Sequence, residues 1–182
     1  MLSKQTIRQQ QLKKLAQPDI QAQQFQAEQL LYQKLLQHPA WKQAQVVALT
    51  ISKGCEIDTK PLIMQALLQG KEVVVPVTKA QGKMDFVSYH PEMDLQVTKY
   101  GILEPTTTQV KNKSQIDLII VPGLAFFANQ KRIGFGGGFY DRYLSDYAGT
   151  TLSLVDPVRD LSRVTCLLEE TDLPIDELIK LS

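Results

Sequence analysis

The chain has 182 residues and a formal net charge of +1 at pH 7, with 43% hydrophobic and 21% charged residues. This length predicts a single domain over residues 1–182, and the balanced charge argues against the extended basic surface that binds nucleic acid or anionic membranes. Because no apolar run approaches the ~20 residues of a membrane span and the N-terminus lacks a secretory signal pattern, we expect a cytoplasmic protein.

The first part of the chain, residues 1–45, is rich in glutamine but has a helical period. Ile7, Leu12 and Leu15 recur at near-helical spacing, and a Pro-Asp pair then ends this first series. Because glutamine is a good helix former, we expect two amphipathic helices with uncharged faces in water, packed as an N-terminal helical hairpin on the rest of the domain. The apolar positions of the second helix are Ile20, Phe25, Leu31, Leu35 and Leu36.

Four short apolar runs rich in β-branched residues follow, at residues 46–51, 72–77, 117–121 and 151–155. Continuous apolar runs are typical of parallel strands that are covered on both faces. Between the first two runs we predict a helix that begins at Thr59 and ends before Gly70, which makes a right-handed crossover unit. Residues 84–89 alternate and predict an antiparallel or edge strand. The expected fold class is α/β, a three-layer fold in which helices flank a mostly parallel sheet.

The segment at residues 121–144 carries the strongest chemical pattern in the chain. Directly before an expected helix it places four glycines in five positions, namely Gly134, Gly136, Gly137 and Gly138. Glycines let backbone N–H groups converge on one point, and a helix N-terminus adds further donors, so the loop is a candidate phosphate-binding site. The spacing fits neither the dinucleotide-binding nor the P-loop fingerprint, and a purely structural turn is the alternative.

Two charged neighbours of this glycine loop favour the phosphate-binding interpretation. Arg132 offers a forked cation that suits phosphate oxygens. Asp141, in the first turn of the expected helix, is placed to hold a divalent metal that bridges such oxygens. The alternative for Asp141 is a helix-dipole carboxylate, which contributes only ~0.3–1 kcal/mol.

Residues 132–142, which read RIGFGGGFYDR, follow PGLAF at residues 122–126. Together they resemble the signature of the 5-formyltetrahydrofolate cyclo-ligase family, in which a Pro-Gly segment precedes an arginine, a glycine loop and an aromatic-Tyr-Asp sequence. The resemblance extends over nearly the whole chain, in order and approximate spacing. The further matching elements are Lys4 and Arg8, residues 56–59, residues 100–105, and Asp172 followed by a closing helix at residues 175–179.

The chain departs from the family pattern at three positions. Phe127 stands where the family usually has aspartate, and Gln130 stands where it usually has glycine. Arg159 is a candidate replacement for a glutamine that often follows the fourth strand, close to the nucleotide.

The resemblance implies an ATP- and Mg²⁺-dependent ligase that closes 5-formyltetrahydrofolate to 5,10-methenyltetrahydrofolate and releases ADP and phosphate. No protein nucleophile is required, because the substrate supplies both nucleophiles, and the sequence offers no Ser/His/Asp or Cys/His constellation. We expect a monomer whose partners are the folate and ATP, with no nucleic acid and no membrane.

The roles that the resemblance implies fall into four overlapping sets. The catalytic residues are Lys4, Arg132 and Asp141, and the Mg²⁺ ligands are Asp141 and Asp172. The ATP-binding residues are Lys4, Arg8, Arg132, Ile133, Gly134, Phe135, Gly136, Gly137, Gly138, Phe139 and Tyr140. The folate-binding residues are Ile51, Glu56, Tyr100, Phe135 and Phe139, with Glu56 on the amino and amide edge of the pterin.

Plainer roles are open for several of these residues. Lys4 and Arg8 lie one helical turn apart, as on a solvated helix face, and Glu56 lies just before a helix start. Tyr100 and Phe139 fit a hydrophobic core.

Two other classes of function are also open. A non-catalytic homologue that binds nucleotide or folate as a regulator is suggested by Phe127 and by the altered segment at residues 156–159. A phosphosugar isomerase or transferase on a similar sheet would need an acid–base pair but no ATP.

Overall fold

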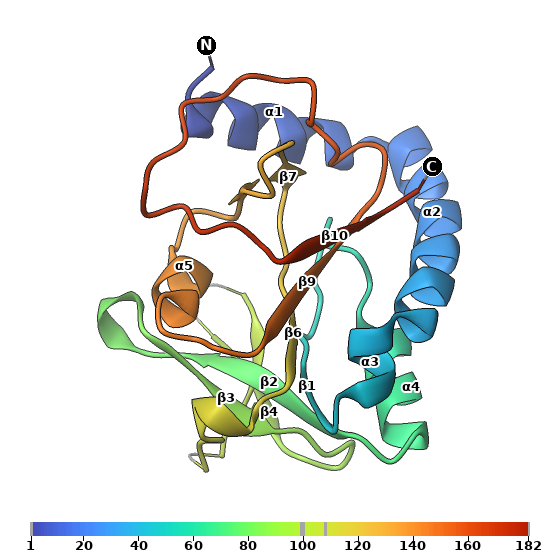
Figure 1. Ribbon diagram of the computed structural model, residues 1–182, viewed down its shortest axis with the longest axis vertical. Coiled ribbons are helices and arrows are strands. Elements are labelled where there is room, and N and C mark those ends of the chain that lie inside the picture. The colour runs from blue at the N-terminus through green and yellow to red at the C-terminus, as the bar shows by residue number, and fades with distance from the viewer. Residues whose placement is uncertain (1, 99–100, 108, 182) are drawn as a thin grey trace.

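The computed structural model describes residues 2–98, 101–107 and 109–181 and has a six-stranded central sheet (Figure 1). The strand order is β10-β9-β6-β1-β2-β3, and every neighbouring pair is parallel except β2 with β3. This confirms the mostly parallel sheet and the antiparallel edge strand. The strands are β1 (Val46–Ala48), β2 (Glu72–Thr78), β3 (Met84–Ser88), β6 (Leu118–Ile120), β9 (Thr150–Val155) and β10 (Glu177–Lys180).

The remaining elements surround this sheet. Two small antiparallel pairs are β4 (Leu95–Val97) with β5 (Leu103–Pro105), and β7 (Ala125–Phe126) with β8 (Arg132–Ile133). The helices are α1 (Lys4–Leu15), α2 (Pro18–Gln37), α3 (Pro39–Gln43), α4 (Lys60–Leu68) and α5 (Phe139–Leu144), with 3-10 turns at Ala80–Gly82 and Lys113–Gln115. No helix among residues 2–98, 101–107 and 109–181 is long and apolar enough to cross a membrane.

Helices cover both faces of the sheet, which explains why its strands are apolar throughout. Alternate residues of each strand point to opposite faces, so Val47 and Leu49 pack with α2, α3 and α4, whereas Ala48 packs with α5. Figure 1 shows α2, α3 and α4 on one side of the sheet and α5 on the other. The three-layer fold class is therefore confirmed.

The two N-terminal helices are confirmed, but their glutamines do not all face water. Gln11 is 4% exposed and donates to the carbonyl oxygens of Leu124 and Val158, at 2.8 and 3.0 Å. Gln24 is also buried, while the apolar Phe25 is 65% exposed. The expectation of uncharged wet faces was therefore wrong for these two glutamines, because buried backbone carbonyls in loops need side-chain donors.

The closing helix predicted at residues 175–179 is wrong, because this segment enters strand β10 beside β9. The carboxylate of Asp176 accepts hydrogen bonds from the backbone N and the hydroxyl of Thr151, both at 2.8 Å. Pairing with a buried strand satisfies the backbone of this short segment, whereas an isolated helix of so few residues is only marginally stable.

Gln130 adopts a left-handed backbone conformation in the tight turn between β7 and β8. Its φ is 63°, and its backbone N donates to the Phe127 carbonyl oxygen at 3.1 Å. Its own carbonyl oxygen accepts from the N of Ile175 at 3.0 Å, so the turn also supports the chain that leads into β10. This geometry explains the glycine that the family usually has here, because only glycine adopts such a φ without steric cost.

We predict that Gln130→Gly raises the free energy of unfolding by about 0.5–1 kcal/mol, since glycine relieves the strain at positive φ. The melting temperature should rise by roughly 2–4 °C per kcal/mol in a chain of this size. The matched control is Gln26→Gly, at an exposed position inside helix α2. This change should lower the free energy of unfolding, because glycine is unfavourable in the interior of a helix. A lower melting temperature for Gln130→Gly would contradict the prediction.

Candidate active site

A cavity of about 1230 Å³ opens at the carboxyl ends of parallel strands β1, β2 and β6. Its lining includes Thr50 and Ile51 just after β1, Pro76 and Thr78 at the end of β2, and Pro122 after β6. β2 and β6 lie on opposite sides of β1, so the sheet changes winding direction here. Ligands of open α/β sheets bind at such a switch point, and this is a signal that sequence reasoning missed.

The site residues predicted from sequence converge on this one cavity. They come from α1, from the loop after β1, from the glycine loop and from the segment before β10. Tyr100, the remaining predicted folate contact, lies outside the described residues. Those that line the cavity are Lys4, Arg8, Ile51, Glu56, Arg132, Ile133, Gly134, Phe135, Gly136, Gly137, Gly138, Phe139, Tyr140, Asp141 and Asp172.

Arginines on both sides hold the glycine loop in place. The Nε atom of Arg8, on α1, donates to the carbonyl oxygen of Gly134 at 3.0 Å. From the other side, Arg142 donates to the carbonyl oxygens of Gly137 and Gly82. Gly136 has a φ of 104°, and a Cβ atom there would lie 3.3 Å from the Arg8 guanidinium carbon. The glycine loop therefore needs glycine both for its backbone conformation and for the close approach of Arg8.

Arg132 and Asp141 form an ion pair at the wall of the cavity. The Nη1 atom of Arg132 lies 2.9 Å from Asp141 Oδ1, and the arginine side chain is 3% exposed. Its guanidinium also lies over the ring of Tyr140, with 5.8 Å from Cζ to the ring centroid. The Nε atom of Arg132 is buried without a hydrogen-bond partner. A buried cation with an unused donor is suited to an anionic ligand.

Lys4 joins the N-terminal helix to the segment before β10. Its Nζ atom lies 2.9 Å from Asp172 Oδ1 and 3.1 Å from Glu169 Oε1. Burial alone would lower the pKa of Lys4, but hydrogen bonds and the charges of the two carboxylates outweigh it and raise the pKa above its ordinary value. Lys4 is therefore a cation at neutral pH, and it lines the same cavity as the glycine loop.

The carboxylates available to a metal ion are few. In the described part of the chain, no group of three His, Cys, Asp or Glu side chains is placed to hold a metal. Asp141 and Asp172 line the cavity, and each is paired with a cation. This donor set fits Mg²⁺, which commonly takes only one or two carboxylates and otherwise binds phosphate oxygens and water.

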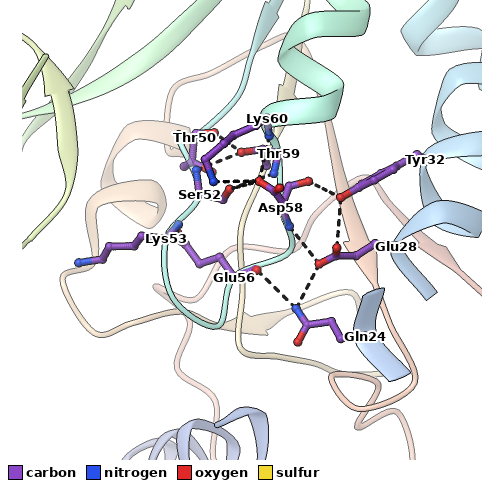
Figure 2. Close-up of polar contacts among 10 residues, drawn as sticks. All are labelled: Gln24, Glu28, Tyr32, Thr50, Ser52, Lys53, Glu56, Asp58, Thr59 and Lys60. Atoms are coloured by element: carbon purple, nitrogen blue, oxygen red, sulfur yellow. Dashed lines mark hydrogen bonds and ion pairs between the residues drawn. The ribbon is translucent and has the colours of Figure 1, made fainter. Parts of the chain in front are cut away.

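Glu56 reaches the cavity from the loop between β1 and α4, at residues 49–59, which we call the β1–α4 loop (Figure 2). Its Oε2 atom accepts a hydrogen bond from the backbone N of Lys53 at 2.8 Å. Burial raises the pKa of Glu56 above its ordinary value, although the Lys53 N–H and the charges of Lys53 and Arg159 partly offset this. Glu56 is thus a partly desolvated acceptor that faces the cavity, not merely a residue before a helix.

Two further polar atoms of the cavity are buried without a partner, one in Glu104, for which no site role was predicted, and one in Tyr140, a predicted ATP contact. Glu104, on β5, is 2% exposed and its Oε1 atom has no hydrogen-bond partner. The buried hydroxyl of Tyr140 also lacks a partner, and burial, with the nearby charge of Glu56, raises its pKa. Buried polar atoms without partners are rare and costly, so these atoms are placed to bind groups of a ligand. The local sequence does not predict that these atoms are buried without partners, because their burial depends on distant segments.

The chain matches a family model and several characterised proteins along most of its length. The model of the 5-formyltetrahydrofolate cyclo-ligase family matches residues 1–180. The 5-formyltetrahydrofolate cyclo-ligase of Escherichia coli strain K12 is 34% identical over 151 residues, which cover 80% of this chain and 83% of that protein. The protein of the same name from Haemophilus influenzae is 33% identical over 162 residues, covering 86% of this chain and 87% of that protein.

Solved structures show the same arrangement. The 5,10-methenyltetrahydrofolate synthetase of Aquifex aeolicus superposes with a TM-score of 0.80 at 28% identity, covering 97% of this chain and 89% of that one. The corresponding protein from Mycoplasma pneumoniae gives a TM-score of 0.76 at 20% identity, with 97% of each chain covered, and so supports the fold.

The raised pKa of Glu56 leads to a pH-dependent prediction. Folding favours the neutral form of this carboxyl, so its ionisation destabilises the fold as pH rises through the raised pKa, and the effect is absent below the pKa of the unfolded chain. Glu56→Gln keeps an acceptor for the Lys53 N–H but removes the charge. We therefore expect this variant to melt at a higher temperature than the wild type at pH 7.5, with a smaller difference at pH 5. An equal difference at both pH values would contradict the assignment.

Proposed function

The chain belongs to the 5-formyltetrahydrofolate cyclo-ligase family and is an ATP-dependent ligase that converts 5-formyltetrahydrofolate to 5,10-methenyltetrahydrofolate, and we propose that the cavity at the carboxyl edge of the sheet is its active site. The observation that supports this site is the convergence in one cavity of every described residue to which the resemblance gives a catalytic, metal, ATP or folate role. Its volume of about 1230 Å³ exceeds the ~300–1,000 Å³ of typical small-molecule pockets, as two substrates side by side require.

In the proposed mechanism the formyl oxygen of the folate attacks the γ-phosphorus of ATP, and the bond from this phosphorus to the β–γ bridging oxygen breaks as ADP leaves. N10 of the folate then adds to the activated formyl carbon and loses its proton, and phosphate departs with the C–O electron pair. Such phosphoryl transfer depends on positioning and on stabilisation of charge. Lys4, Arg8 and Arg132 supply the positive charge, and the glycine loop supplies backbone N–H donors to the triphosphate.

We propose Mg²⁺ as the metal cofactor, with Asp141 and Asp172 as its protein ligands. Held by these two carboxylates, the ion would supply positive charge that offsets the negative charge of the triphosphate. Because Asp141 and Asp172 are paired with Arg132 and Lys4, the same four side chains keep the local charge balanced before ATP arrives.

The folate is proposed to lie against the apolar part of the cavity. Ile51, Phe135 and Phe139 offer surface to its rings, with Tyr100 as a further proposed contact. The carboxylate of Glu56 is proposed to accept the amino and amide N–H groups of the pterin. The Oε1 atom of Glu104 is a second acceptor without a protein partner, available to another donor of the substrate.

We propose further that the whole chain acts as one domain and as a monomer. Both the N-terminal helix and the segment before β10 contribute side chains to the same cavity, so a single chain can complete the site. A cytoplasmic location is proposed because Cys55 and Cys166 are free thiols, which a reducing compartment maintains.

The purified protein, mixed with 5-formyltetrahydrofolate, ATP and Mg²⁺, is expected to produce a rise in the absorbance of methenyltetrahydrofolate. Omission of ATP, or chelation of the metal, should abolish the rise. Tight folate binding without turnover would instead support the non-catalytic regulator. Turnover that persists in the chelator would overturn the proposed metal requirement.

Asp141→Asn should lower turnover about 10- to 100-fold, the usual size of effect when a partner of a metal site is changed. The asparagine keeps the size and an acceptor for Arg132 but loses the charge that holds the metal. Folate binding, measured by titration without ATP, should stay close to the wild-type value. Asp146→Asn is the control, because Asp146 is a 74% exposed partner of Lys113 outside the cavity lining. Equal turnover of Asp141→Asn and wild type would remove Asp141 from the mechanism.

A further inference from the structure

Helix α2 presents three polar side chains to the interior at the place where an apolar stripe is expected. Gln24, Glu28 and Tyr32 follow one another at helical spacing of four residues, and each is 6% exposed. Burial of a carboxylate and an amide is costly unless they are hydrogen-bonded. Figure 2 shows all three pointing at the β1–α4 loop, which carries Glu56.

Glu28 and Tyr32 bind the backbone of Asp58, two residues after Glu56. The Oε1 atom of Glu28 accepts from the backbone N of Asp58 at 3.0 Å. The hydroxyl of Tyr32 donates to the carbonyl oxygen of Asp58 and lies 3.3 Å from Glu28 Oε2. Both backbone polar groups of Asp58 are therefore occupied by side chains of α2.

Gln24 binds the backbone of Glu56 itself and of Cys55, the residue before it. Its Nε2 atom donates to the carbonyl oxygens of Cys55 and Glu56, both at 3.4 Å, and to Oε1 of Glu28 at 3.3 Å. Within the β1–α4 loop, Glu56 N donates to Lys53 O at 3.1 Å, and the hydroxyl of Ser52 donates to Oδ1 of Asp58 at 2.7 Å. Side chains of α2 therefore hold the backbone before and after Glu56 by hydrogen bonds.

Arg159 supports the same loop from the C-terminal half of the chain. It is 2% exposed, it is paired with the buried Asp156, and it donates to the carbonyl oxygen of Cys55. Arg159 does not line the cavity, so it does not take the place of a nucleotide-binding glutamine. The expectation that it replaces that glutamine beside ATP is not supported by its position.

None of Gln24, Glu28 and Tyr32 lines the cavity, whereas Glu56 does. Gln24 and Glu28 instead line a second, smaller hollow that also includes Glu56, so their contact with the cavity runs through the loop. From these contacts we propose that Gln24, Glu28 and Tyr32 are positioning residues for folate recognition, which fix the backbone on both sides of Glu56 and so aim its carboxylate into the cavity. This proposal rests on the proposed function, in which Glu56 binds the pterin.

The geometry also singles out a variant that should keep the network intact. In Glu28→Gln the amide oxygen can accept from Asp58 N and Gln24 Nε2, while the amide nitrogen donates to the Tyr32 oxygen. Tyr32 can then direct its single proton to the Asp58 carbonyl. Glu28→Ala, by contrast, leaves the Asp58 N–H without its acceptor and removes one of the three acceptors of the Gln24 amide.

The experiment is a double-mutant cycle on the dissociation constant of 5-formyltetrahydrofolate, titrated against the full-length protein without ATP. Glu28→Ala should weaken binding about 5- to 10-fold, and Glu28→Gln should restore it to within about twofold of the wild type. In the Glu56→Ala background, Glu28→Ala should cause no further loss, because the side chain that it positions is gone. Binding of a non-hydrolysable ATP analogue should not change in any of these variants.

Leu31→Val controls for loss of stability alone, since Leu31 is a fully buried residue of the same helix that packs in the core. It should lower the melting temperature and leave folate binding unchanged. If Glu28→Ala does not fold, Gln24→Leu, which removes the donors to Cys55 and Glu56, takes its place in the cycle.

Two results would overturn the positioning role. One is multiplicative loss in the double mutant, and the other is wild-type folate affinity in Glu28→Ala when Glu56→Ala binds weakly. Failure of the proposed function gives a different result, namely a wild-type protein that binds no folate at all.

Discussion

The ion pair between Lys4 and Asp172 joins the N-terminal helix to the segment before β10 at the proposed active-site cavity. It fixes α1 against the segment before β10, and Arg8 of the same helix then reaches the Gly134 carbonyl. The helix itself is docked mainly by its buried side chains, Ile7, Gln11 and Leu15, and the ion pair adds a contact at the edge of the cavity. An ion pair that is partly exposed contributes only ~0–1 kcal/mol. A pair of this strength is weak enough for both side chains to exchange partners when the proposed ligands, ATP at Lys4 and a metal ion at Asp172, bind.

This arrangement changes the meaning of the near-zero net charge. A formal charge of +1 suggested a protein without a strong preference for polyanions. In the structure, Arg132 and Lys4 are each matched by a carboxylate within 3 Å, so the cavity gathers opposite charges without a net excess. Such a balance would suit the proposed complex of triphosphate and Mg²⁺. The cationic side chains could bind its phosphates, and the carboxylates could bind its metal ion.

The sequence predicted those parts of the molecule whose signal is local. The four apolar runs became parallel strands because each is covered on both faces, and the glycine loop was visible because its backbone conformation needs glycine at Gly136. The segment before the C-terminus was mistaken for a helix, because its pairing with β9 depends on residues far along the chain. The burial of Glu104 was missed for the same reason. The switch point beside β1 was not predicted, because the strand order depends on how distant strands pair.

The glutamine-rich composition of the N-terminal helices does not predict which of their glutamines are buried. Gln11 and Gln24 look like surface residues of a glutamine-rich helix, yet both are buried and donate to backbone carbonyls of loops that border the site. A loop that carries a functional carboxylate cannot use sheet or helix hydrogen bonds for its own backbone, so its polar groups must find side-chain partners. The helix that packs against such a loop then has to give up apolar burial at those positions. In this protein the polar interior face of α2, formed by Gln24, Glu28 and Tyr32, meets that requirement and supports the loop of Glu56 from outside the cavity.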